Sequence, residues 1–217
     1  MSTLSTLVRR YQRRRQVLQR IKPSSGLCLE LGPLDKPVIK KSEARVFYVD
    51  IASTDDLRQR YEGDGITLAD KICPVDFVWN GLPLRDIIPA SLVFDYVIAS
   101  HVIEHTFDMI GWLQEIASVM KAGGILSLAV PDKRFTFDLE RETTTLEQLL
   151  KVHFERAAEG RESFRDHFQV FTFESFAATI GALCSDGVIP FHLLSLWRRS
   201  NTALEFIAIL QRGPSER

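Results

Sequence analysis

Two acidic residues and a glycine lie at the ends of short apolar stretches, where they could bind a nucleoside. Glu30 lies in the stretch 27–31, which is followed directly by Gly32, and Asp50 ends the stretch 46–50. A glycine at such a position lets a ligand approach the main chain closely. An acid that ends the second strand of a parallel sheet can accept hydrogen bonds from both hydroxyls of a ribose. These residues therefore predict a site for an adenosine-containing cofactor.

Two further pairs of residues end the next two apolar stretches. Asp76 and Phe77 offer an acid for an adenine amino group beside an aromatic face, and Ser100 and His101 end the stretch that follows. Taken singly these signals are weak, because glycine turns and terminal aspartates are common in loops. Their recurrence at successive strand ends is what predicts one common site, since ligands bind beyond the carboxyl ends of parallel strands.

The segment His101-Val-Ile-Glu104-His105 also fits a metallopeptidase pattern, in which two histidines bind zinc and the glutamate activates water. That chemistry needs both histidines on one face of a regular helix, whereas His101 directly follows a predicted strand. The other interpretation is that Glu104 and His105 brace the turn between this strand and the next helix. We assign no metal ligand from the sequence and keep a zinc metallopeptidase as the less favoured alternative.

The elements that must position these residues follow from the apolar pattern. We expect strands at 27–31, 45–50, 72–77, 92–99 and 125–130, and helices at 55–61, from about 108 to 121, near 146–158 and at 173–183. Two last strands, 191–196 and 204–211, have only a short connection and should therefore be antiparallel. The pattern predicts a doubly wound α/β fold with a mostly parallel sheet of about seven strands.

The first crossover of this predicted sheet is unusually short. Only 13 residues, 32–44, connect the first strand to the second. That is about the minimum for a parallel return, so we expect its helix to be short or missing.

The charge of the chain is distributed unevenly. The net charge is −1, but residues 1–22 contain seven arginines and lysines and no acid, which leaves residues 23–217 at −8. We expect a basic N-terminal helix over 1–22 that could contact an anionic surface, phosphates or an acidic partner, or pack on the domain. We expect no nucleic-acid partner, because the segment lacks the interleaved glycine and aromatic residues of such modules.

The composition fits a globular intracellular domain. With 217 residues, of which 45% are hydrophobic and 25% charged, the chain is the size of a single domain, which we place at 23–217. Cys28, Cys73 and Cys184 are widely separated and form no CxxC pair, which favours reduced thiols in a cytoplasmic protein. We find neither the apolar stretch of a signal peptide nor a run of the roughly 18 apolar residues that a membrane span needs.

With these strand ends placed, the sequence resembles the class I S-adenosylmethionine-dependent methyltransferases, in the style of their small-molecule, methyltransferase type 11-like branch. The resemblance is carried by LCLELG (27–32), VFYVD (46–50), VDF (75–77), FDYVIASHVIEH (94–105) and IGWLQEIASVMKAGGILSLAVPD (110–132). It implies a Rossmann-like fold and S-adenosyl-L-methionine as the cofactor. The cofactor-binding residues would then be Glu30, Gly32, Pro33, Leu34, Asp50, Ile51, Asp76, Phe77, Ser100 and His101.

By this resemblance, Glu30 and Gly32 would contact the methionine part, Asp50 the ribose and Asp76 the adenine side. Ser100 and His101 would line the sulfonium end. The first loop departs from the glycine-rich family pattern, because Gly32 is followed by Pro-Leu-Asp-Lys-Pro.

Two residues are candidates for removing a proton from an acceptor hydroxyl. His105 lies near the presumed sulfonium end, and imidazole is suited to proton transfer near neutral pH. Asp132 follows the fifth strand at the ligand edge, although it could equally lie in a solvated turn with ion pairs to Lys133 and Arg134.

Residues 133–171 are too long for an ordinary connection. We interpret them as a cap that forms the acceptor pocket, with an extra helix packed on the core as the other interpretation. The segment contains His153 and His167 and five phenylalanines, Phe135, Phe137, Phe154, Phe164 and Phe168.

These inferences together predict an enzyme, an S-adenosylmethionine-dependent methyltransferase. We expect it to transfer a methyl group to a hydroxyl of a small molecule or sugar. The glycine-poor first loop motivates an alternative from another class, a non-catalytic cofactor-binding or partner module with the same fold.

Overall fold

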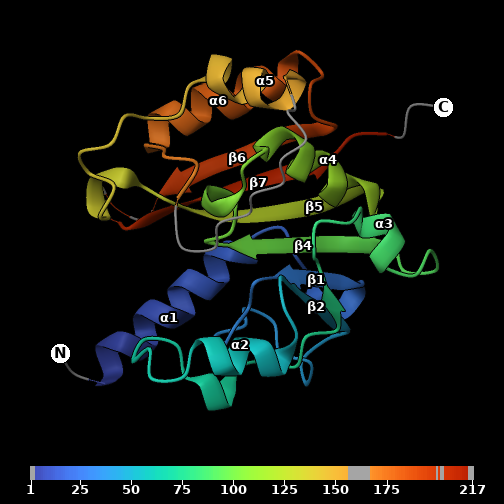
Figure 1. Cartoon of the computed structure of the whole chain (residues 1–217), viewed down its shortest axis with the longest axis vertical. Helices are drawn as coiled ribbons and strands as arrows, with labels where there is room; N and C mark the ends of the chain where they lie inside the picture. Colours follow the sequence, from blue (N-terminus) through green and yellow to red (C-terminus); the bar gives the residue numbers. More distant parts are fainter. Residues whose placement is uncertain (1–2, 156–166, 199, 201–202, 215–217) are drawn as a thin grey trace.

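The structure, a computed structural model, describes residues 3–155, 167–198, 200 and 203–214. Within these residues seven strands form one sheet with the order β3-β2-β1-β4-β5-β7-β6 (Figure 1). The strands are β1 (Cys28–Leu31), β2 (Val46–Asp50), β3 (Phe77–Val78), β4 (Phe94–Ser100), β5 (Met120–Pro131), β6 (Phe191–Arg198) and β7 (Glu205–Arg212). The pairs from β3 to β5 are parallel, and β7 is antiparallel to β5 and β6. The predicted doubly wound α/β fold, with its antiparallel last strand, is confirmed.

Four of the described helices begin at side chains that accept hydrogen bonds from free main-chain N–H groups. The helices are α1 (Thr3–Val17), α2 (Thr54–Arg60), α3 (Leu84–Ile87), α4 (Met109–Ser118), α5 (Leu146–Phe154) and α6 (Phe173–Ser185), with 3-10 turns η1 (Pro23–Ser25), η2 (Ala69–Lys71), η3 (Ile103–His105) and η4 (Lys133–Phe135). Ser53 caps α2, Asp108 caps α4, and both α5 and α6 begin with a complete capping box. Within the described residues, no helix has the length and apolar character needed to cross a membrane.

The bounds of two strands differ from the prediction. The third strand was expected at 72–77, but β3 contains only Phe77 and Val78, because Pro74 has no N–H and Val75 donates its N–H to the Thr54 hydroxyl at 2.9 Å. The fifth strand begins at Met120 rather than at 125. The preceding helix, expected to reach Lys121, ends at Ser118, because Met120 pairs with Phe94.

Alternate residues of the sheet face two separate apolar layers. On β1, Leu29 and Leu31 pack in the cluster that contains α4 and α6, whereas Cys28 packs with Val17 of α1 and with Ile21. In Figure 1, α5 and α6 lie together along β6, and α1 lies on the other side of the strands. The basic N-terminal helix is therefore part of the packed fold.

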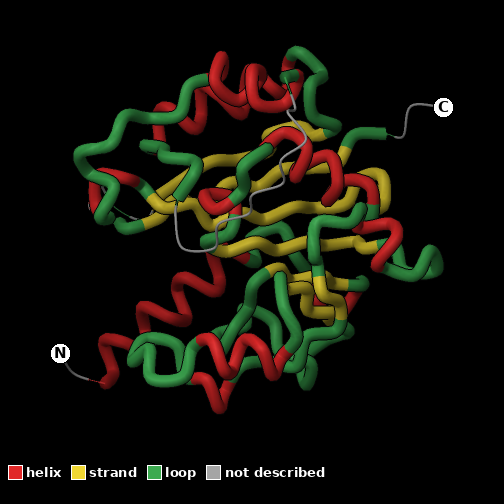
Figure 2. The backbone as a smooth tube through the Cα atoms, viewed as in Figure 1, coloured by secondary structure: helices red, strands yellow, loops and turns green. Residues whose placement is uncertain are grey.

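The short first crossover contains turns and no helix, as predicted (Figure 2). The buried carboxylate of Glu30 accepts hydrogen bonds from the main-chain N–H groups of Val38 (2.7 Å) and Ile39 (3.1 Å). The Tyr48 hydroxyl donates to the Ile39 carbonyl at 2.7 Å. These side chains replace the hydrogen bonds that a helix would supply. The loop thereby places Gly32 and Leu34 at the end of β1.

Candidate active site

A cavity of about 170 Å³ lies at the carboxyl ends of β1, β2 and β4. Its walls combine apolar and aromatic side chains with a few polar groups, the usual composition of a small-molecule site. It is lined by Leu31, Gly32, Leu34, Val49, Asp50, Ile51, Tyr61, Trp79, His101, Val102, His105, Thr106 and Trp112. The structure therefore brings together six of the predicted site residues: Gly32, Leu34, Asp50, Ile51, His101 and His105.

Asp50 has one carboxylate oxygen ready for a ligand. Oδ1 accepts a hydrogen bond from the Ile51 N–H at 2.8 Å, whereas Oδ2 is buried and has no hydrogen-bond partner among the described residues. Burial raises the pKa of Asp50 to about 6, although the Ile51 N–H and the charge of Arg60 oppose the shift. A buried oxygen without a partner is costly, and a hydroxyl that enters the cavity can satisfy it.

The main chain is strained at the edge of the cavity. Leu34 (φ 44°) and His101 (φ 55°) are the two non-glycine residues with positive φ in the described part of the chain, and both line the cavity. Gly32 has φ 60°, and a Cβ there would lie 3.1 Å from Val102 Cγ2. Strain of this kind concentrates at functional sites.

Four other predicted cofactor residues lie outside the cavity wall, each held by other contacts. Glu30 faces the α1 side and holds the first crossover, and its burial raises its pKa to about 7 despite the amides of Val38 and Ile39. Asp76 forms an ion pair with Lys41 (2.6 Å) and accepts the Tyr48 N–H (2.7 Å). The remaining two are Phe77, whose ring stacks on Phe47, and the buried Pro33.

An arginine of α1 reaches the end of β4 and forms a polar group that we call the clasp, made of Arg13, Ser100, His101 and Glu205. Arg13 holds Glu205 through two hydrogen bonds of 2.7 and 2.9 Å and donates to the Ser100 hydroxyl at 2.5 Å. Glu205 also contacts His101 Nε2 at 2.8 Å. Ser100, the last predicted cofactor residue outside the cavity wall, is thus bound to Arg13.

Glu104 and the clasp together set the charge of His101. Partial burial of the ring, whose side chain is 42% exposed, lowers its pKa, but the carboxylates of Glu104 and Glu205 outweigh this effect and raise the pKa to about 9. Burial likewise raises the pKa of Glu205, but His101 and Arg13 outweigh it and lower the pKa to about 2. At neutral pH the clasp therefore contains an imidazolium and a guanidinium on one carboxylate.

The helix that a metallopeptidase site needs is not formed by residues 101–105. His101 ends the β4–β5 pairing, with its main-chain N–H on the Ala129 carbonyl at 3.0 Å, and its ring turns toward Glu205. Only Ile103–His105 form a single 3-10 turn. His101 and His105 therefore do not share a regular helix face, as the sequence analysis argued.

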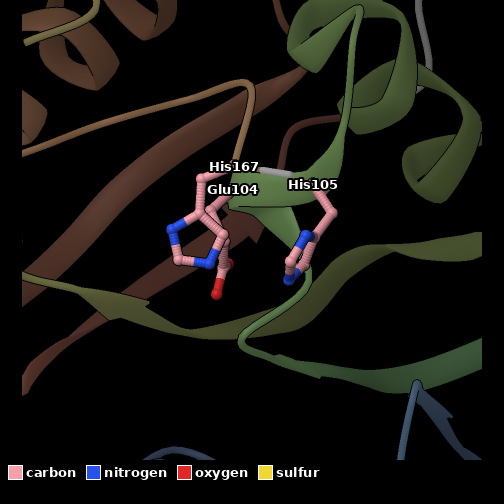
Figure 3. Close-up of side chains that lie close together, drawn as sticks. All are labelled: Glu104, His105 and His167. Carbon is pink, nitrogen blue, oxygen red and sulfur yellow. The ribbon is translucent and has the colours of Figure 1, made fainter. Parts of the chain in front are cut away.

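A different set of side chains gathers beside the cavity. Glu104, His105 and His167 lie with their possible ligand atoms within 4.8 Å of one another, and Figure 3 shows the two rings and the carboxylate facing a common space. His167 reaches this place because the N–H groups of Phe168 (2.8 Å) and Gln169 (3.0 Å) both donate to the main-chain carbonyl of Glu104.

Asp132, the second predicted base, is bound in an ion pair and is absent from the cavity wall. Arg134 donates to its two oxygens at 2.8 and 2.6 Å, and the Phe173 N–H donates at 3.3 Å. Burial raises the pKa of Asp132, but the guanidinium outweighs it and holds the pKa below its usual value. This environment makes Asp132 a poor proton acceptor.

The segment 133–171 packs a helix on the core, as one of its two interpretations expected, and its role as an acceptor cap stays a prediction. Leu149 of α5 and Phe171 are buried in the core, whereas Phe137 and Phe154 are exposed. His153 binds both oxygens of Asp108, the cap of α4, at 3.1 Å. Residues 156–166, which include Phe164, lie outside the described part of the chain.

Several aromatic and polar residues of the cavity were not predicted from the sequence. Trp79 follows β3 directly, and Trp112 lies on the cavity side of α4, so a search at strand ends and helix starts could have found them. Tyr61 and Thr106 lie in turns after α2 and η3 and carry no such signal. His167 was noted only for its segment, because nothing in the sequence relates it to Glu104.

A family model described as a methyltransferase domain matches residues 7–180, which include most of α1. A comparison with curated protein sequences found no match.

Solved structures share the fold at low sequence identity. They include the CurJ carbon methyltransferase (TM-score 0.51, 16% identity, 91% of this chain and 51% of that chain). The magnesium protoporphyrin IX methyltransferase of Synechocystis PCC 6803, with bound SAH, gives a TM-score of 0.51 at 14% identity over 97% of this chain and 84% of that chain. A chain of Rhodobacter sphaeroides provisionally titled a Zn-dependent alcohol dehydrogenase gives 0.57 at 15% identity over 94% and 90%. The chain thus spans about half of the first of these structures and most of the others, and this likeness concerns the fold alone.

Proposed function

We propose that this chain, which belongs to the methyltransferase-domain family and uses S-adenosyl-L-methionine, transfers a methyl group to a hydroxyl oxygen of a small molecule or sugar. The observation that carries the proposal is that one cavity contains both Asp50, with its buried carboxylate oxygen, and His105. Asp50 is suited to accept a hydrogen bond from a ribose hydroxyl, and His105 is suited to accept a proton from the methyl acceptor. One space therefore contains a candidate residue for each requirement of the proposed reaction, cofactor binding and proton removal.

The residues around Asp50 fit the cofactor. Asp50 Oδ2 would accept a hydrogen bond from a ribose hydroxyl, and Gly32 would leave room at the main chain after β1. Leu34 and Ile51 would pack against the bound molecule, and the apolar walls would exclude water. When bound, S-adenosylmethionine supplies a methyl carbon that the positive charge of its sulfur activates toward displacement.

The acceptor half of the cavity belongs to His105 and the aromatic residues beside it. His105 lines the cavity and is our candidate for accepting the hydroxyl proton. The ring of the exposed Phe137 lies 4.6 Å from that of His167, and Phe107 packs edge-on against Phe168 at 5.5 Å. His167 in turn packs edge-on against the cavity-lining His105 at 4.8 Å, so the exposed ring of Phe137 continues from His105, and such aromatic faces suit a flat or sugar-like acceptor. The segment 133–171 would thus act as the predicted acceptor cap.

Two further parts of the proposal concern the basic N-terminal segment and the location of the protein. Arg10, Arg15 and Arg20 of the basic segment are exposed and are the candidates for contact with an anionic surface. The cytoplasmic location stays a prediction from cysteine usage.

The atom that receives the methyl group can be identified directly. The protein is incubated with methyl-labelled S-adenosylmethionine and a panel of sugars, phenols, amines and carboxylic acids, and labelled products are analysed by NMR and mass spectrometry. We expect a labelled methyl resonance in the O-methyl region from a hydroxylated acceptor. Transfer to nitrogen or carbon, with hydroxylated compounds left unlabelled, would contradict the proposal.

A further inference from the structure

Glu104, His105 and His167 bring three possible metal-ligand groups to one place, and neither cofactor binding nor the fold explains this. The three residues come from η3 and from a segment more than sixty positions later. Their possible ligand atoms all lie within 4.8 Å of one another. In Figure 3 the side chains converge and do not point apart. Two imidazoles and one carboxylate are a donor set typical of divalent transition metals.

The carboxylate of Glu104 lacks the partners that a buried charge requires. The side chain is 1% exposed, and neither Oε1 nor Oε2 has a hydrogen-bond partner among the described residues. Its ion pair with His101, 3.4 Å between Nδ1 and Oε1, is longer than a hydrogen bond between charged groups, and that ring also contacts Glu205. A buried carboxylate with two unsatisfied oxygens is costly unless a cation binds it.

The ring of His167 is oriented as in metal sites. Its Nδ1 lies 2.5 Å from Asp138 Oδ2, and Arg141 holds the other oxygen of Asp138 at 2.7 Å. Asp138 and His167 are both largely buried, so this pairing fixes the tautomer and leaves Nε2 for another partner. A carboxylate bound to the remote nitrogen of a histidine is the usual outer contact of a metal ligand.

We propose that Glu104, His105 and His167 bind one divalent transition-metal ion of the zinc class, with Asp138 as the residue that positions His167. Zinc–ligand distances of about 2.0–2.2 Å put tetrahedral donor atoms about 3.3 Å apart, so the three groups need to draw together slightly on binding. Three protein ligands leave a fourth position open. This is the arrangement of catalytic sites and not of closed structural ones.

The position of this site gives the ion a role at the acceptor. His105 belongs both to the cluster and to the cavity wall, so the ion would lie at the cavity edge. An ion there would bind an acceptor oxygen and lower the pKa of its hydroxyl. This role rests on the proposed function and changes one part of it. With the ion bound, His105 is a ligand and no longer the base, and the hydroxyl proton passes to solvent. Ion binding itself does not depend on methyl transfer.

Binding of the ion can be measured without an acceptor. Metal-free protein is titrated with Zn²⁺ in the presence of a competing chelator, and the same samples are titrated with S-adenosylhomocysteine. We expect a single ion per chain in the wild type. His167→Ala should weaken Zn²⁺ binding by about 100-fold and Asp138→Asn by about 10-fold, while binding of S-adenosylhomocysteine stays unchanged.

The matched control is His192→Ala, because His192 is exposed on β6 and takes no part in the cluster. It should leave Zn²⁺ affinity unchanged. If His167→Ala fails to fold by circular dichroism, Glu104→Gln replaces it, with a loss of at least about 10-fold expected. A wild type that binds no Zn²⁺, or a cluster variant that binds it as tightly as the wild type, overturns the metal site. Either result leaves the proposed function intact if S-adenosylhomocysteine still binds.

Discussion

The two halves of the cavity are built in different ways. The half that we propose to bind the cofactor contains Gly32, Leu34, Asp50 and Ile51, each within a few residues of a strand end. The acceptor half joins η3 to residues 167–169 through main-chain hydrogen bonds across more than sixty positions. The first half depends on local strand geometry and the second on tertiary docking. We therefore expect substitutions in one half to leave the function of the other unchanged.

The largest expected effect comes from the cofactor half. Gly32→Val places a β-branched residue at φ 60° and directs its Cβ toward Val102. To relieve strain of about 1–3 kcal/mol and this contact, the main chain after β1 should shift away from its binding position. Binding of S-adenosylhomocysteine should then weaken by about 100-fold, while Zn²⁺ affinity stays the same. Calorimetric titration measures both.

The control for this substitution is Gly187→Val. Gly187 has φ 66° and open space around its Cβ position, so the variant adds the same backbone strain away from the cavity. Its thermal stability should fall without a change in cofactor affinity. Equal losses of affinity in the two variants would show that strain alone, and not the geometry of the cofactor half, causes the effect.

The contrast between the halves also explains what the sequence could and could not predict. Asp50 was predictable because the length and alternation of its strand place it at the carboxyl edge of the sheet, and this placement does not depend on distant parts of the chain. Glu30 lies on the predicted strand, but its carboxylate faces the α1 side. There it accepts hydrogen bonds from main-chain N–H groups of the first crossover, which has no helix to satisfy them. His167 was not predictable as a neighbour of Glu104, because periodicity contains no information about which loop docks on η3.

The clasp connects α1 to the cavity, because Arg13 binds Glu205 and Glu205 contacts the cavity-lining His101. Arg13→Ala removes three hydrogen bonds and leaves the carboxylate of Glu205, 17% exposed, with His101 alone. Unfolding by urea should show a loss of about 1 kcal/mol, since Arg13 is partly exposed and solvent screens the pair. Arg10→Ala, at an exposed position of the same helix, should change stability by less than about 0.5 kcal/mol. Equal losses would mean that the clasp adds nothing to the docking of α1.

We expect a smaller effect of pH on the stability that the clasp contributes. The raised pKa of His101, about 9 against an ordinary 6.5, means that its contribution is complete below pH 6.5 and is lost as the pH rises through about 9. The lowered pKa of Glu205, about 2 against 4.5, means that its contribution is complete above pH 4.5 and is lost toward pH 2. The clasp should therefore stabilise the fold most between pH 4.5 and pH 6.5.

Urea unfolding of the wild type and of Glu205→Gln over a pH series tests this window. The difference in unfolding free energy should be largest between pH 4.5 and 6.5 and should shrink toward pH 9. Subtracting the variant removes the titration of Asp50 and Glu30, which the two proteins share. If the difference in unfolding free energy stays constant from pH 4.5 to 9, the contribution of Glu205 to stability does not depend on the charge of His101.

The most direct test of the cofactor half, and so of the whole account, is calorimetric titration of S-adenosylhomocysteine into the wild type and Asp50→Ala. Hydrogen bonds to a charged group contribute about 1.5–3 kcal/mol, so the variant should bind more than about 10-fold more weakly with unchanged stoichiometry. The wild type should bind a single molecule per chain. No binding to the wild type, or equal affinity in Asp50→Ala, would contradict the account.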